Sequence, residues 1–240
     1  MAPVNGTGNV LEIHDLSVHY HDGTEALAGV SLAIRPGQRA AIIGPNGAGK
    51  TTLLLAAMNA VHYHGRIIVD GIELSRSTQA AARGRCGMTF QNADDQLFMP
   101  TLLDDVAFGP LNQRLSADQA QAQAAAAIAA VGLAGMEARA AHHLSGGQRR
   151  LAALATILSM SVKLLLLDEP AANLDFRSRQ RLMETLAARG EALLLATHDL
   201  DLVEHLCNRI IVLDRGHIVA DGPTGRILAD RPLLARHGLA

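Results

Sequence analysis

The stretch AAIIGPNGAGKTTLLLAAM, residues 40–58, decides the fold of this chain. Ala40–Ile43 has the apolar character of a buried parallel strand, and Thr51–Met58 has the pattern of an amphipathic helix. Between them, Gly44–Thr51 matches the loop pattern G-x-x-x-x-G-K-[ST]. A strand, this loop and a helix in that order form the context in which the pattern binds phosphate groups. The sequence therefore predicts a nucleotide-binding loop rather than an ordinary surface turn.

The residue types in this loop suit that chemistry. Glycines let the backbone fold tightly enough for successive N–H groups to face the phosphates at the positive end of the next helix. Lys50 can reach the β- and γ-phosphates, and the hydroxyl of Thr51 can ligate Mg²⁺. The predicted nucleotide contacts are Gly44, Pro45, Asn46, Gly47, Ala48, Gly49, Lys50, Thr51 and Thr52.

A second segment, LLLLDEP at Leu164–Pro170, supplies two acids at the end of an apolar run. The run reads as a buried strand of a parallel sheet, and ligands bind at the carboxyl ends of such strands. A magnesium–nucleotide site needs a carboxylate besides the phosphates, so Asp168 is predicted to hold Mg²⁺. Glu169 is predicted to polarise the attacking water. The alternative is that both acids are solvated groups at a strand end.

The third segment is LSGGQ, Leu144–Gln148. With all three segments present, the chain resembles the nucleotide-binding subunit of an ATP-binding cassette (ABC) transporter. In that family this motif opens a helix and contacts the γ-phosphate bound to the other subunit. The resemblance therefore implies that Ser145, Gly146, Gly147 and Gln148 contact ATP held by a second ATPase subunit. A hydroxyl, unobstructed N–H groups and a helix start suit that task, although Ser145 also suits a simple helix N-cap.

The resemblance extends to single residues along residues 10–225. It implies that Tyr20 stacks on adenine, that Gln91 senses Mg²⁺ and the attacking water, and that His198 holds the γ-phosphate and the catalytic water. The alternatives are a half-buried strand aromatic for Tyr20 and a structural histidine for His198. Leu174 and Asp175 resemble the loop that crosses the dimer seam.

The three residues before that loop are Ala171, Ala172 and Asn173, a mild departure from the family pattern.

The order of patterns predicts an α/β fold with a P-loop NTPase core. Gly- and Asp-rich turns near the start suggest antiparallel hairpins, and apolar strands return after a helical region. We predict one ABC ATPase domain over 10–225, with a core of 10–91 and 161–225, a helical insert of 92–160 and a tail of 226–240. The core sheet is mainly parallel, and the N-terminal subdomain is antiparallel. Gly109–Pro110 reads as a turn, and Ser116–Gln119 as a capping box.

Composition narrows the class of protein. No apolar run is long enough to span a bilayer, and the N-terminal residues lack a secretion signal. The two cysteines have no paired spacing, which suits a reducing cytosol, and the net charge of −2 gives no case for nucleic acid. The pairs His62/His64 and His142/His143 lack a third ligand, so surface or structural histidines are expected and no bound cobalt or nickel is predicted.

The segment Gln91–Asn112 narrows the function further. It mixes acids with Leu97, Phe98, Met99 and Phe108, which predicts a groove for a partner helix. The alternative is ordinary subdomain core, and both interpretations can hold together. The segments DDQLFMPT and DVAFGPLN resemble those of the energy-coupling-factor (ECF) subgroup of importers, particularly the ATPases of cobalt and nickel uptake.

This resemblance implies an ATP- and Mg²⁺-dependent motor at the cytoplasmic face of the cell membrane. Its implied partners are a transmembrane coupling protein, a substrate-binding membrane component and a second ATPase subunit, identical or a sibling. The alternatives are another importer, for instance for a vitamin, an exporter, or a soluble ABC ATPase of chromosomes or ribosomes. A chromosomal role is disfavoured because no sustained heptads are present.

Overall fold

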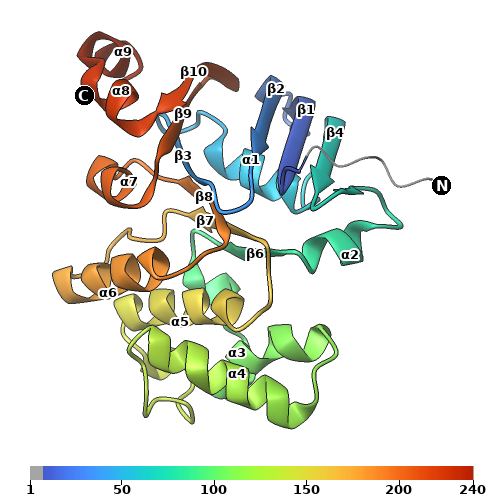
Figure 1. Cartoon of the computed structure of the whole chain (residues 1–240), viewed down its shortest axis with the longest axis vertical. Coiled ribbons are helices and arrows are strands. Elements are labelled where there is room, and N and C mark those ends of the chain that lie inside the picture. Colours follow the sequence, from blue (N-terminus) through green and yellow to red (C-terminus); the bar gives the residue numbers. More distant parts are fainter. Residues whose placement is uncertain (1–7, 240) are drawn as a thin grey trace. The chain divides into compact units, whose positions relative to one another are not determined.

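A computed structural model describes residues 8–239 of the chain. These residues divide into two compact units (Figure 1). The first unit contains the described residues up to Cys86, Lys163–Asp168 and those from Gly190 onward, and the second contains Gly87–Val162 and Glu169–Arg189. The predicted domain boundaries remain a prediction. Within residues 8–239 no helix is long and apolar enough to cross a membrane. The prediction about a secretion signal rests mostly on residues 1–7, which lie outside the described residues.

One sheet of the first unit is antiparallel, as the sequence predicts for the N-terminal region. It consists of β1 (Leu11–His19), β2 (Glu25–Ile34), β4 (His64–Val69) and β5 (Ile72–Glu73), in the order β2-β1-β4-β5. Ile13 of β1 pairs with Leu32 on one side and Ile67 on the other, and these three side chains are buried. The alternation of buried and exposed residues in β2 follows from having one face on the core.

The other sheet of the first unit carries the strands that lead to the predicted site. Strands β9, β3, β8 and β7 are parallel neighbours, and β10 adds an antiparallel edge. Every residue of β7 and β8 is buried, which explains their uninterrupted leucine runs. The bounds are β3 (Arg39–Ile43), β7 (Leu164–Asp168), β8 (Ala192–Ala196), β9 (Arg209–Asp214) and β10 (His217–Pro223).

Helix α1 (Lys50–Ala57) follows the phosphate loop as predicted, but it is not amphipathic. Six of its eight residues are buried, because it packs against β2 as well as β7 and β8. A helix enclosed in this way is apolar nearly all round rather than along one stripe. The remaining helices of this unit are α2 (Gln79–Arg83), α7 (Leu200–Leu206), α8 (Thr224–Ala229) and α9 (Arg231–Arg236), and β6 (Cys86–Thr89) leads into the second unit.

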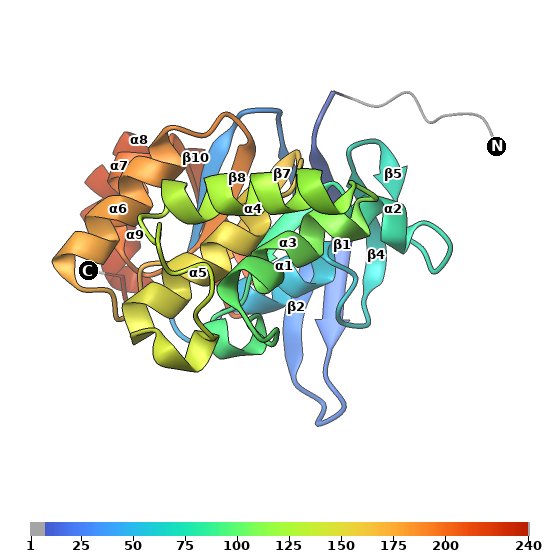
Figure 2. The same ribbon diagram turned by 90° about the horizontal axis from the view of Figure 1, so that it is seen from below.

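The second unit is helical. Helices α3, α4 and α5 pack on one another, with α4 lying across α3 and α5 when seen from below (Figure 2). Both predicted helix starts are confirmed, since Ser116 and Ser145 each form a complete capping box with the residue three positions on. The bounds are η1 (Ala93–Asp95), α3 (Leu102–Asn112), α4 (Ala117–Ala130), η2 (Ala141–His143), α5 (Gly146–Leu158) and α6 (Phe176–Ala187).

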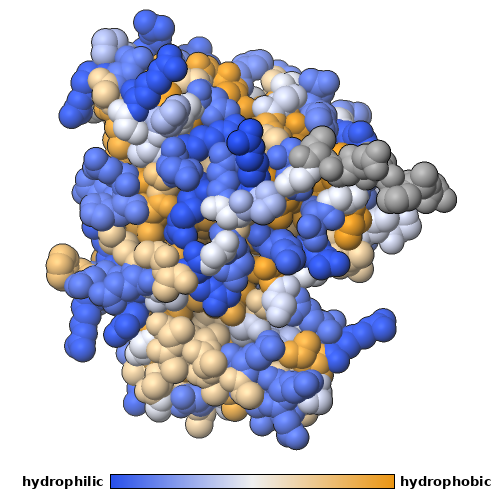
Figure 3. All heavy atoms as spheres, viewed as in Figure 1, coloured by the Kyte–Doolittle hydropathy of each residue, from blue (hydrophilic) through white to orange (hydrophobic). Residues whose placement is uncertain are grey.

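The alanine-rich helix α4 is packed, as expected from its spaced apolar residues. Ile128 is buried, together with Val131 and Leu133 just after the helix. The outward positions of α4 include several exposed alanines, and the surface over these helices is mildly apolar (Figure 3). Small side chains here leave the exposed face of α4 smooth.

The predicted turn at Gly109–Pro110 is wrong, because both residues lie inside α3. A proline in a helix removes one donor and leaves the carbonyl four residues earlier without its helical partner. Here that carbonyl belongs to Val106, and the hydroxyl of Ser159 donates to it at 2.8 Å. A side chain at the end of α5 thus satisfies the group that Pro110 leaves open, and α3 continues to Asn112.

Candidate nucleotide-binding site

The phosphate loop of the first unit has the conformation that its glycines were expected to allow. Gly47 and Gly49 have φ angles of 79° and 103°, in the left-handed region. Gly44 is required for space instead, since a Cβ atom there would lie 2.0 Å from the carbonyl oxygen of Leu213. The loop therefore packs tightly against the end of β9, and a side chain cannot replace either kind of glycine without strain.

Lys50 begins helix α1 and turns back over the loop. Its Nζ donates to the carbonyl oxygens of Gly44 at 2.7 Å and Pro45 at 3.0 Å. The side chain is buried, and the charge is placed at the centre of the loop. An ammonium group in this position is suited to a multiply charged phosphate chain.

The predicted Mg²⁺ ligands from the loop and from β7 lie together. The Thr51 hydroxyl donates to Oδ2 of Asp168 at 2.8 Å, and Asp168 is only 2% exposed. The two residues are 117 positions apart in sequence, so the sheet brings them together. A hydroxyl and a carboxylate oxygen are the ligand types that Mg²⁺ takes beside phosphate oxygens. The residues present therefore fit a magnesium–nucleotide site.

The strand register explains why these groups meet. Ala196 at the end of β8 pairs with Ile42 of β3 on one side and Asp168 of β7 on the other. His198 follows β8 and is exposed, so it leaves the sheet at the same edge. Asp199 beside it caps α7 by accepting from the Leu202 N–H at 2.9 Å. The first unit thus places the phosphate loop, Asp168 and His198 at the carboxyl ends of three adjacent strands.

Tyr20 follows β1 and is 40% exposed. Its hydroxyl lies 3.0 Å from Oγ1 of Thr52, in the first turn of α1. The ring is therefore held beside the helix that begins at the phosphate loop. This position is compatible with stacking on a base whose phosphates occupy the loop.

The LSGGQ motif opens helix α5 of the second unit. The Ser145 Oγ accepts from the Gln148 N–H at 3.2 Å, and the Gln148 side chain accepts from the Ser145 N–H at 2.9 Å. A Cβ atom on Gly146 would meet nothing within 4 Å, which leaves its backbone accessible. Capping is thus an observed property of Ser145, and it leaves an exposed helix start of the kind that attracts anions.

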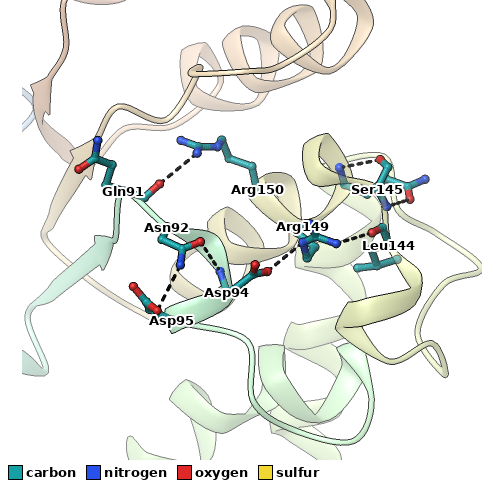
Figure 4. A network of polar contacts seen from close by, with 9 residues as sticks. Gln91, Asn92, Asp94, Asp95, Leu144, Ser145, Arg149 and Arg150 are labelled. Atoms are coloured by element: carbon teal, nitrogen blue, oxygen red, sulfur yellow. Dashed lines mark hydrogen bonds and ion pairs between the residues drawn. The ribbon is translucent and has the colours of Figure 1, made fainter.

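Gln91 and Glu169 both belong to the second unit, and one arginine side chain links their backbone carbonyls. Figure 4 labels Gln91 and this arginine. Arg150 of α5 donates through Nη2 to the Gln91 carbonyl at 3.0 Å and through Nη1 to the Glu169 carbonyl. The side-chain amide of Gln91 points away from the arginine (Figure 4). Glu169 has a φ angle of 46°, an unusual conformation for a residue with a side chain.

A second arginine joins the helix start to the turn after Gln91. Arg149 forms an ion pair with Asp94 of η1 at 2.9 Å and donates to the Leu144 carbonyl at 2.8 Å (Figure 4). Neither Arg149 nor Arg150 is among the residues predicted from the sequence. The sequence signal for them is the pair of arginines directly after LSGGQ.

The histidine pairs show no metal geometry. The ring centroids of His62 and His64 are 5.5 Å apart, with the rings edge to face, and those of His142 and His143 are 4.1 Å apart. Within residues 8–239, no group of three or more His, Cys, Asp or Glu residues could hold a metal ion.

Comparison with known proteins agrees with this geometry. The sequence profile described as ABC transporter matches residues 27–172. A Gloeobacter violaceus protein provisionally named as an ABC transporter ATP-binding protein is 47% identical over 233 residues, covering 95% of each chain. The chain therefore belongs to the ABC transporter family as an ATP-binding domain, which implies ATP hydrolysis and binding of ATP with Mg²⁺.

Two further relatives concern the ECF resemblance. The energy-coupling factor transporter ATP-binding protein EcfA of Methanothermobacter thermautotrophicus is 39% identical, over 96% of this chain and 76% of that protein. The solved structure of cbiO1 from Clostridium perfringens, described as part of the ABC transporter complex cbiONQ, superposes with a TM-score of 0.82. It is 32% identical and covers 97% of this chain and 95% of that one. These findings confirm the predicted resemblance and the predicted fold class.

Proposed function

We propose that this chain is the ATP-hydrolysing motor subunit of an ECF-type importer that takes up a micronutrient, with cobalt or nickel ions as the cargo. The observation that carries the enzymatic part is the Thr51–Asp168 contact beside the phosphate loop. The ECF assignment is supported by the likeness to EcfA and cbiO1. The choice of cargo is supported only by the sequence of residues 94–112, which resembles that of ATPases of cobalt and nickel uptake.

In the proposed reaction, water attacks the γ-phosphorus of ATP, and the bond to the β,γ-bridging oxygen breaks to give ADP and inorganic phosphate. Lys50 and the loop amides hold the phosphates, and Tyr20 stacks on adenine. Glu169 accepts the proton of the attacking water, while Gln91 and His198 position that water. Thr51 and Asp168, with Gln91, would hold Mg²⁺, which neutralises phosphate charge.

We propose that two ATPase subunits act together. Ser145, Gly146, Gly147 and Gln148 of one subunit would contact the γ-phosphate held by the other. The exposed start of α5 supports this role, because the first N–H groups of a helix have no partner within the helix and attract anions. Hydrolysis would remove the phosphate that both subunits contact and so release them from each other.

The membrane partners would bind the second unit. Phe98 is 65% exposed and meets Phe108 of α3 edge to face at 5.3 Å, and Leu111 lies three residues further on the same helix. An exposed apolar patch of this kind suits the apolar face of a partner helix. A transmembrane coupling protein would supply that helix, and the motor would work at the cytoplasmic face of the membrane.

The enzymatic proposal is tested with the purified full chain. Glu169→Gln should lower ATP turnover by about 100- to 10,000-fold, as expected for loss of a general base, while ATP still binds. Lys50→Ala should instead weaken ATP binding. Normal turnover by the Glu169→Gln variant would refute the role of Glu169.

The transport proposal needs cells that contain the membrane partners. Removing the gene should lower accumulation of labelled Co²⁺ or Ni²⁺, and the wild-type gene should restore it where the Glu169→Gln gene does not. Unchanged accumulation of both ions would refute the proposed cargo. It would leave the ATPase assignment intact and point to another importer or an exporter.

A further inference from the structure

Arg150 connects three predicted functional segments of the second unit through one side chain. It lies on α5, in the second turn of the helix that the LSGGQ motif opens. Its guanidinium donates to the backbone carbonyls of Gln91 and Glu169, which lie 59 and 19 positions away in the sequence. The arginine therefore bridges the segments that carry the predicted water-sensing and catalytic side chains.

The bridge acts at a strained point of the backbone. Glu169 has φ 46°, in the left-handed region, which is unfavourable for a residue with a side chain. Such a conformation persists only where the surroundings fix it. A guanidinium is a rigid, permanently charged fork, so its two donors hold two carbonyls at a set separation.

We propose that Arg150 is a positioning residue for ATP hydrolysis. By fixing the carbonyl of Glu169 it sets the direction of the Glu169 side chain, and by fixing Gln91 it sets the start of the loop that follows β6. Because Arg150 stands on α5, a movement of the LSGGQ helix start changes both positions together. This inference rests on the proposed function, since it assigns a task in the same reaction.

The chain contains a matched control for this arginine. Arg83 also donates to two backbone carbonyls, those of Met58 and Asn59, each at 2.8 Å. Asn59 is also left-handed, with φ 52°. This clamp lies in the first unit beyond the end of α1, and the two carbonyls that it holds belong to none of the predicted site residues. Arg83→Met therefore removes the same kind of clamp without touching the proposed machinery.

The test compares Arg150→Met, Arg150→Lys and Arg83→Met in the full chain. Arg150→Met should lower kcat by about 10- to 100-fold, because small misplacements of a catalytic group have effects of that size. Its affinity for ATP, measured without Mg²⁺, should stay within about threefold, since the two carbonyls that its guanidinium holds belong to Gln91 and Glu169, which lie outside the phosphate loop. Arg150→Lys should recover part of kcat, and Arg83→Met should keep it. A kcat for Arg150→Met within threefold of wild type would overturn the inference.

A double-mutant cycle separates positioning from a general loss of structure. In the Glu169→Gln background, Arg150→Met should lower the residual rate by clearly less than the 10- to 100-fold expected in the wild type, because the carboxylate that it directs is already gone and only its hold on Gln91 remains. A full additional loss in that background would overturn the inference. If Arg150→Met does not fold, Arg150→Lys decides: a kcat lowered with unchanged ATP affinity supports the inference, and an unchanged kcat refutes it. Absence of ATPase activity in the wild type would instead refute the proposed function itself.

Discussion

The two units hold their predicted functional residues by different means. In the first unit, the phosphate loop and Asp168 are placed by the backbone, because the loop follows β3 and the aspartate ends β7. In the second unit, Gln91 and Glu169 are tied by an arginine that reaches across to their carbonyls. The first arrangement depends on a short continuous motif, and the second on single side chains far away in sequence.

This difference has a physical consequence. Backbone placement by a buried parallel sheet tolerates few changes, since each residue packs against several neighbours. Placement by a side chain bonded to a carbonyl can be altered by one substitution without disturbing the core. We therefore expect substitutions at the site of the first unit to destabilise its packing. Substitutions of the arginine in the second unit should displace the site residues while the unit stays folded.

The largest effect should come from the phosphate loop. Gly44→Ala places a Cβ atom 2.0 Å from the Leu213 carbonyl oxygen, whereas Gly47→Ala meets no atom within 4 Å. Gly44→Ala should cost at least about 3 kcal/mol of unfolding free energy because backbone must move. Gly47→Ala should cost only about 1–2 kcal/mol, the strain of its φ angle. Urea unfolding of both variants measures this, and equal costs would show that the loop is not tightly packed.

A smaller effect is expected where a side chain completes the helix of the second unit. Ser159→Ala leaves the Val106 carbonyl in α3 without the hydroxyl that donates to it at 2.8 Å. The expected cost is about 1–3 kcal/mol of unfolding free energy.

Pro110→Ala restores an N–H four residues after Val106, so in that background the cost of Ser159→Ala should fall by at least half. Additive costs in thermal or urea unfolding would show that the serine does not compensate for the proline.

A pH-dependent effect follows from Asp105 of α3. Asp105 is 4% exposed, and its Oδ1 accepts from the N–H groups of Phe98 and Met99, each at 2.9 Å. Burial raises the pKa of Asp105, with the two backbone hydrogen bonds opposing the shift and Asp104 adding to it. The folded state therefore binds the proton more tightly than the unfolded state. Its contribution to stability is lost as pH rises from the unfolded pKa through the folded one.

Asp105→Asn keeps an acceptor for both N–H groups but cannot ionise. Its stability relative to wild type should therefore rise between the two pKa values and then stay constant at higher pH. Asp105→Ala should be less stable than both at every pH, because the two N–H groups lose their acceptor. Unfolding measured from pH 4 to pH 8 checks this. A wild type that gains stability relative to Asp105→Asn as pH rises would contradict the assigned direction.

The smallest effect concerns the two cysteines of the first unit. Burial raises the pKa of both Cys86 and Cys207 to about 12. At pH 8 neither thiol should ionise or react with a disulfide reagent in the native protein, and both should react after unfolding in urea. Replacing Arg150 should not change this, because loss of that clamp leaves the first unit folded. Rapid native labelling of either cysteine in the Arg150→Met variant would contradict the separation between the units.

The same contrast explains what could be predicted from the sequence. The phosphate loop, the buried strand before Asp168 and the capped helix at Ser145 were predictable because local patterns specify them. The helix through Gly109 and Pro110 was not predictable, because it depends on a hydrogen bond from Ser159 to the Val106 carbonyl. These two residues are 53 positions apart in the sequence. Arg150 was missed for the same reason: its partners are backbone carbonyls, and no sequence pattern marks a carbonyl that needs a donor.

The bond between Ser159 and Val106 also has a mechanical meaning. It ties the last turn of α5 to the middle of α3, and α3 carries the exposed side chains of Phe108 and Leu111 on its outer surface. A force applied to that surface would therefore pass through α3 and reach α5 near its C-terminal end. The opposite end of α5 is the LSGGQ motif, so the packing of α3 on α5, together with this hydrogen bond, connects the exposed apolar surface of α3 to the start of α5.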